Sequence, residues 1–186
     1  VGALSVNQLR ALESNDLVAL RAKIQSSQIS ALTDDQIQSL ASDQVGALTT
    51  GQVASLSTSQ IAALSSTQAG ALTSAQVRAL STTQLQSLSN AAVTALTTGA
   101  VAALSTTQVA ALGTEQIRSL SDTQIDSLTS TQVRSLTAQQ VRALETYDVA
   151  AVATNLQSAQ VQALSTNQLS ALGNGIAALS TGQVRA

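Results

Sequence analysis

Apolar and polar residues recur along this chain with a period of eight. Leu stands at every eighth position from Leu32 to Leu144, which defines fourteen octads whose positions we count from that Leu. Position one is Ser or Thr in twelve octads, and position four is Gln in twelve. Position five is Val, Ile or Leu in thirteen, and position seven is always Ala or Ser. A repeat this short and regular predicts an architecture in which each unit is stabilised by its neighbours.

Most octads carry the signals that begin a short α-helix. Ser or Thr followed three residues later by Gln is a capping box, in which the hydroxyl and the Gln side chain each satisfy a backbone N–H of the first turn. Leu before the cap and Val or Ile four residues after it form a hydrophobic staple. The pattern therefore predicts an all-α solenoid with one very short helix per octad. The variable positions two, three and six are expected to face water.

The charged residues support this interpretation independently. Acidic side chains are favoured in the first turn of a helix and basic side chains in the last turn. Nine of the ten acidic residues lie at or just after the predicted caps, with Asp126 the exception. All eight basic residues lie late in their units. Charges scattered only for solubility would not sort in this way.

Two other architectures explain the pattern less well. In one continuous α-helix, eight residues turn through about 800°, so the Leu stripe would wrap around the helix and face no single partner. A β-solenoid needs alternation, but positions zero and five would point to opposite faces of a strand. Ala, Gln and Leu also favour helix over strand. A solenoid of separate short helices is therefore preferred over a β-solenoid and over a long supercoiled helix.

A longer period is superimposed on the octads. The octad frame covers residues 24–151, and it slips at two twelve-residue units, 12–23 and 144–155, which both carry Glu at the cap and Asp in place of the box Gln. Their spacing indicates a super-repeat of about 132 residues, whose second copy begins near residue 133 and lacks one residue near 173–176. We expect a longer helix and a structural corner or spacer in each unit, with a binding feature as the alternative. Residues 1–186 are interpreted as a single repeat array, a fragment of a longer chain.

The composition contains few of the residue types that catalyse reactions or bind metals. The chain has no Cys and no His, and its only aromatic residue is Tyr147, at a position expected to be exposed. The commonest metal ligands, acid–base groups and thiol nucleophiles are therefore missing. Asp34 and Asp35 are better explained as helix-start charges than as calcium ligands, because calcium needs six to eight oxygens. We predict no enzyme, no catalytic or cofactor-binding residue and no metal site.

The expected partners are the neighbouring repeats of the same chain, with self-association into fibres as a further possibility. The net charge is −2, and there is no basic patch for phosphates and no set of aromatic residues for bases, so we expect no nucleic-acid binding. No apolar run approaches the ~20 residues that span a bilayer, so we expect no membrane insertion.

Octads such as residues 72–79 and 104–111, Leu-Thr-Ser-Ala-Gln-Val-Arg-Ala and Leu-Ser-Thr-Thr-Gln-Val-Ala-Ala, carry a family resemblance. They resemble the octapeptide repeat arrays of very large bacterial secreted or cell-surface proteins, including adhesin-like chains. The resemblance implies an extracellular or cell-surface location and a role as spacer, stalk or fibre. Two alternatives stay open: a self-assembling filament or sheath subunit, and a repeat module that binds ice or carbohydrate.

Overall fold

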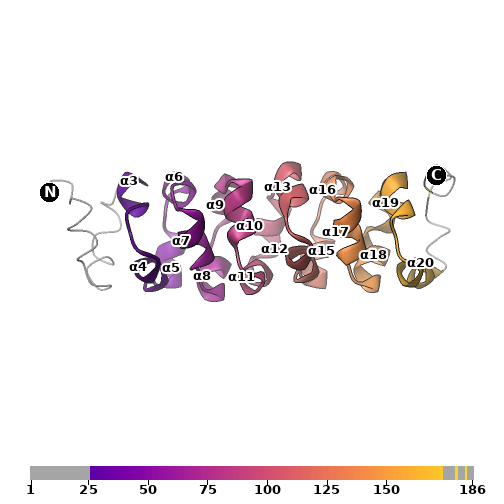
Figure 1. The fold of residues 1–186 in the computed structure, drawn as a ribbon, viewed down its shortest axis with the longest axis horizontal. Coiled ribbons are helices and arrows are strands. Elements are labelled where there is room, and N and C mark those ends of the chain that lie inside the picture. The colour runs from indigo at the N-terminus through magenta and orange to yellow at the C-terminus, as the bar shows by residue number, and fades with distance from the viewer. Residues whose placement is uncertain (1–25, 174–178, 180–182, 184–186) are drawn as a thin grey trace.

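The computed structural model describes residues 26–173, 179 and 183 of the chain. In this part the chain is a coil of very short helices that advances along one axis, and it contains no β-strand (Figure 1). The prediction of an all-α repeat solenoid is therefore confirmed, and the β-solenoid and the unbroken long helix are excluded for the described residues. The helices, in chain order, are α3 Ser26–Ile29, α4 Asp34–Gln38, α5 Ser42–Gly46, α6 Thr50–Ala54, α7 Thr58–Ala62, α8 Ser66–Gly70, α9 Ser74–Ala79, α10 Thr82–Ser87, α11 Asn90–Ala95, α12 Thr98–Ala102, α13 Thr106–Ala111, α14 Thr114–Arg118, α15 Asp122–Asp126, α16 Ser130–Ser135, α17 Ala138–Ala143, α18 Thr146–Val152, the 3₁₀ helix η2 Ala153–Asn155, α19 Ser158–Gln162 and α20 Thr166–Leu172.

The backbone breaks at Leu and at the cap of each octad. At the end of α9, Leu80 (φ −64°, ψ 139°) and Ser81 (φ −68°, ψ 162°) are both extended, and the next helix begins immediately after them. Two consecutive extended residues turn the chain through a corner. Because both conformations are open to any L-residue, these corners need no glycine. The only positive φ among the described residues is that of Gly173, at 45°.

The capping boxes form as the sequence predicts. In α7 the Gln60 N–H donates to Ser57 Oγ at 3.1 Å, and the Ser57 N–H donates to Gln60 Oε1 at 2.8 Å. Where the cap is Ala41, only the second of these bonds is left, from the Ala41 N–H to Gln44 Oε1 at 2.9 Å. The cap hydroxyl is therefore an addition to the helix start, which begins at the same position without it.

Replacing Ala41 by Ser is expected to raise the free energy of unfolding by about 1 kcal/mol, because the new hydroxyl accepts from the Gln44 N–H in the first turn. Urea unfolding monitored by circular dichroism measures the change. Ala138→Ser, at the exposed first residue of α17, is the matched control and should not stabilise the chain. An equal gain from both substitutions would contradict a capping effect.

Three octads make one turn of the coil. Helix α10 packs on α7 before it and on α13 after it, and α9 packs in the same way on α6 and α12. Each helix therefore lies against the helices three octads earlier and three octads later in the chain. Leu at position zero and Val, Ile or Leu at position five fill the interior: Leu72, Val77 and Leu85 are at most 2% exposed. One continuous apolar core runs the length of the described coil.

The twelve-residue unit at 144–155 occupies two sides of the coil. Helix α18 has seven residues and continues into η2, which matches the longer helix expected there. Helix α18 packs on α15, η2 packs on α16, and α19 then packs on α17. The unit thus fills the space of two octads, although it has four residues fewer than two octads. The equivalent unit at 12–23 lies outside the described residues, as does most of 173–176, where the super-repeat lacks one residue.

Candidate functional site

The buried glutamines at position four join successive turns of the coil. Gln76 is 2% exposed, and its Oε1 accepts from the Thr73 N–H at 2.7 Å, which closes its own capping box. Its Nε2 donates to the carbonyl oxygens of Val45 at 3.0 Å and Leu48 at 2.7 Å, which lie 31 and 28 residues earlier. The 28-residue contact recurs with little change in the glutamine column, which we define as Gln60, Gln68, Gln76, Gln84, Gln108, Gln116, Gln124, Gln132 and Gln140.

These contacts serve carbonyls where one helix ends and the next corner begins. The Val45 carbonyl, near the end of α5, also accepts from the Leu48 N–H at 3.2 Å, and the Leu48 carbonyl lies in the corner that follows that helix. In both cases the donor is a Gln side chain of the following turn of the coil. The capping-box pattern predicts only the acceptor role of the box Gln, and the donor role is seen only in the structure. A signal was available, since an amide whose oxygen closes the box still has two N–H donors that a buried site must satisfy.

Most side chains at position six are exposed, as expected, and some of them also contact the next turn of the coil. Gln86 Nε2 donates to the Ala111 carbonyl at 2.7 Å, and Thr94 Oγ1 donates to the Ser119 carbonyl at 2.7 Å, each across 25 residues. At Gly46 an added Cβ would lie 2.9 Å from the carbonyl oxygen of Ala71, across the same interval. A polar side chain at position six can therefore hydrogen-bond to the next turn of the coil. A glycine at position six lets the backbone of the next turn approach closely.

Asp148 stands where the glutamine column crosses the twelve-residue unit. Its side chain is buried, with 4% exposed, and its Oδ1 is the one buried side-chain polar atom without a hydrogen-bond partner among the described residues. Burial is the main cause that raises the pKa of this carboxyl to about 6, and the negative charges of Asp122, Glu145 and Asp126 act in the same direction. A hydrogen bond from the Glu145 backbone opposes the shift. The site therefore favours a neutral side chain.

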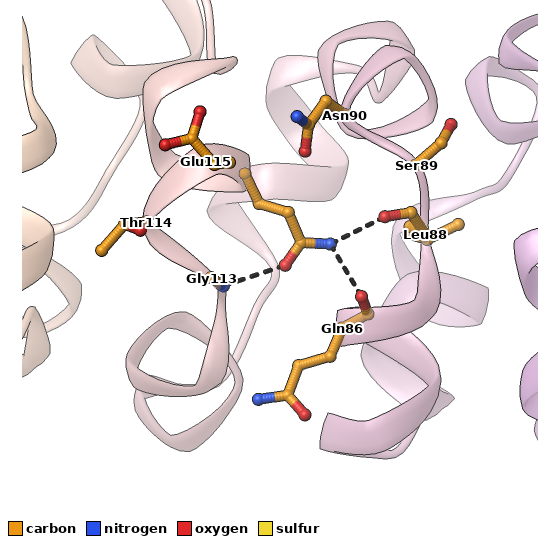
Figure 2. Close-up of a pocket in the computed structure, with 8 residues that line it drawn as sticks. Gln86, Leu88, Ser89, Asn90, Gly113, Thr114 and Glu115 are labelled. Atoms are coloured by element: carbon orange, nitrogen blue, oxygen red, sulfur yellow. Dashed lines mark hydrogen bonds between the residues drawn. The ribbon is translucent and has the colours of Figure 1, made fainter.

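A shallow recess of about 490 Å³ lies where the cap hydroxyl is missing at Gly113 (Figure 2). Gln116 is one of the residues that line it: its Oε1 accepts from the Gly113 N–H at 2.9 Å, and its Nε2 donates to the carbonyls of Gln86 at 3.3 Å and Leu88 at 2.9 Å. The one charged residue of the lining, Glu115, is bound to Arg118 at 2.9 Å on the exposed surface. The polar groups of Gln116 and Glu115 are thus already engaged in contacts within the coil.

Apart from the turn at α4, which carries Asp34 and Asp35, one side of the coil displays only hydroxyl residues at positions one to three over four successive turns. We call it the hydroxyl face and define it as residues 57–59, 81–83, 105–107 and 129–131, from the octads of α7, α10, α13 and α16, which stack on one another. These side chains are exposed or half-exposed. Hydroxyl pairs form within it, for example Ser57 Oγ with Ser59 Oγ at 2.9 Å. The three-octad turn makes this face regular, although the Thr positions are irregular along the chain.

The other residues with candidate chemistry, Asp34, Asp35 and Tyr147, lie at exposed positions. Asp34 and Asp35 occupy the first turn of α4, as expected for helix-start charges. Tyr147 is 63% exposed, as predicted. In the described part of the chain no group of three or more His, Cys, Asp or Glu could hold a metal ion. Over the same residues no helix is long and apolar enough to span a bilayer.

Comparison with known families gives one result. The family model of the ALTTAQ repeat matches five overlapping stretches, residues 11–50, 21–58, 45–82, 72–106 and 101–138. Together they cover more than half of the chain, and all but the first residues of the array lie in the coil described above. A search of curated proteins gives no match.

Proposed function

The chain belongs to the ALTTAQ repeat family, and on that premise we propose that it is a structural segment, an extracellular spacer, stalk or fibre of a bacterial protein. The observation that carries the proposal is the way the coil is joined. Each turn contacts the turn before it and the turn after it, through the glutamine column and the apolar core. Such a solenoid lengthens by adding equivalent turns and needs no change elsewhere in the structure.

The geometry gives the spacer a scale. Packed helices lie about 8–10 Å apart, so each coil turn of three octads adds about 9 Å of length. This length is far less than that of an extended chain or a single helix with the same number of residues. The gain is lateral stiffness, because each turn presents three helices that pack on the next turn. We therefore propose a stalk that is short for its residue number and resists bending.

Removing one whole coil turn tests this function. A chain lacking residues 56–79 is expected to stay folded, and its largest dimension in small-angle X-ray scattering should fall by about 9 Å. A chain in which the same three octads are duplicated should lengthen by the same amount. A largest dimension that does not follow the number of turns, or loss of helical circular dichroism on deletion, would refute the spacer proposal.

The proposed location rests on the resemblance to arrays of secreted and cell-surface proteins, and the lack of Cys is compatible with it. An antibody raised against the array should label intact cells that make the full-length protein, or recover it from their medium. Labelling only after the cells are broken open would contradict an extracellular location.

Self-association into a filament or sheath is the first alternative. Sedimentation equilibrium and electron microscopy of the purified array distinguish the two roles. Single dispersed rods at all concentrations favour the spacer, and long fibres that grow with concentration favour the filament.

The hydroxyl face favours a second alternative, a module that binds ice or carbohydrate. Its exposed rows of Ser and Thr recur once per coil turn and carry no charge. In this case Thr58→Lys with Thr106→Lys should abolish thermal hysteresis or glycan binding. The same change on another side of the coil, Ser66→Lys with Thr114→Lys, should leave it intact. Absence of both activities in the unchanged array would eliminate this function.

A further inference from the structure

The glutamine column is interrupted at Ala92, at Ala100 and, in the twelve-residue unit, at Asp148, which alone of the three has a polar side chain. Gln140, one unit earlier, donates from Nε2 to the carbonyls of Val109 at 2.9 Å and Leu112 at 2.8 Å, across 31 and 28 residues. The same offsets from position 148 lead to the carbonyls of Ile117 and Leu120. The residue at that position is Asp148, and an ionised carboxylate has no proton to donate to them.

After the unit the column resumes with a shorter spacing. Gln160 Nε2 donates to the carbonyls of Val133 at 2.9 Å and Leu136 at 2.7 Å, across 27 and 24 residues. Each offset is four residues smaller than in the octads, which is the number that the twelve-residue unit lacks. Asp148 therefore lies between two intact links of the column, with its buried Oδ1 unpaired.

We propose that the twelve-residue unit is a pH-responsive joint, in which a proton on Asp148 restores the missing donor toward the preceding coil turn. When Asp148 is protonated, its hydroxyl can donate to a backbone carbonyl as the glutamine amides do. When it is ionised, its buried Oδ1 carries negative charge without a hydrogen-bond partner, which is unfavourable. The contact between the twelve-residue unit and the preceding coil turn is therefore stronger when Asp148 is protonated and weaker when it is ionised.

The charges around Asp148 support the neutral state. Helix α15, on which α18 packs, contributes Asp122 and Asp126, and the cap of α18 itself contributes Glu145. The packed elements η2 and α20 carry no titratable side chain. The basic residue between Ile117 and Leu120 is Arg118, which is bound to Glu115. Acidic neighbours and burial thus act together, and no described ion pair reaches Asp148.

The direction of the pH effect follows from the pKa of Asp148, which rises from 3.8 to about 6 on folding. Between these two values the folded chain holds a proton that the unfolded chain has released. The joint is therefore stabilised on the acidic side, and this stabilisation is lost as the pH rises through that interval. The contribution of Asp148 to the folding equilibrium constant should fall roughly fifty-fold from pH 4 to pH 7.

The titration of the Asp148 carboxyl carbon, followed by NMR, tests the proposal first. We expect a midpoint near 6, and a midpoint near the ordinary value of about 4 would overturn it. Urea unfolding at several pH values gives the second test. Asp148→Asn and Asp148→Gln, which supply an amide donor, should be more stable than the unchanged chain at pH 7 and should lose its pH dependence in this interval.

Asp35→Asn is the matched control, since it removes an exposed carboxylate at the start of α4 and should keep the wild-type pH profile. Hydrogen exchange locates the effect. After correction for intrinsic rates, amides of α18 and η2 should lose protection between pH 5 and pH 7.5, while those of α13 should not. An equal loss along the whole coil, or a wild-type pH profile in Asp148→Asn, would overturn the joint.

Discussion

Replacing Gln76 by Leu is expected to lower the free energy of unfolding by about 4 kcal/mol, although Leu is apolar and close to Gln in size. The substitution removes the acceptor of the Thr73 N–H and the donor to Val45 and Leu48. Each buried polar group that loses its partner costs about 1–3 kcal/mol. Urea unfolding followed by circular dichroism measures the effect. A gain in stability would show that burial of apolar area at this position outweighs the links between turns.

Gln139→Leu is the matched control for this experiment. Gln139 lies at the exposed position three of its octad, next to column member Gln140, so its replacement should change stability by no more than about 0.5 kcal/mol. Gln76→Glu separates the two halves of the side chain, because Glu keeps the acceptor and loses the donor. Its defect should shrink at low pH, where a protonated Glu can donate again.

Replacing Leu85 by Ala is expected to lower the free energy of unfolding by about 3–4 kcal/mol, which is typical of a large-to-small change in a core. Leu85 in α10 is 0% exposed and lies in the single apolar core between neighbouring coil turns. The cavity cannot be filled by rearrangement of a loop, because short helices stacked above and below hold the site open. Denaturant unfolding measures the loss.

Leu85→Val provides the graded comparison, since Val is the common residue at position five and the change removes one methylene. It should cost about 1 kcal/mol. Tyr147→Ala, at the most exposed large apolar residue, should cost almost nothing. If all three substitutions had similar effects, position five could not be the core position that the structure shows.

The helices could be predicted from the sequence because their signals are local. Ser or Thr at the cap, Gln three residues later, and the flanking Leu and Val all act within one octad, so the start of α9 at Thr73 needs no information from elsewhere in the chain. The burial of Leu72 and Val77 followed from the same pattern. The seven residues of α18 followed from the longer unit that contains it.

The coil could not be predicted in the same way, because the number of octads per turn depends on contacts between residues that lie three octads apart. The donor role of Gln76 and the contact of Thr94 with Ser119 exist only once that number is three. The unpaired oxygen of Asp148 and the regularity of the hydroxyl face depend on the same fact. The sequence showed that Asp148 replaces a box Gln, but only the stacking shows what the replacement removes.

The three-octad turn is the central claim, and spin labels test it directly because the chain has no Cys of its own. Labels at Thr82→Cys and Thr106→Cys should lie about 10 Å apart along the coil, which gives strong dipolar broadening in electron paramagnetic resonance. A pair only two octads apart, Ser66→Cys and Thr82→Cys, should broaden less. A distance of about 36 Å for the first pair, as in one unbroken helix, or stronger coupling in the second pair, would contradict the three-octad coil.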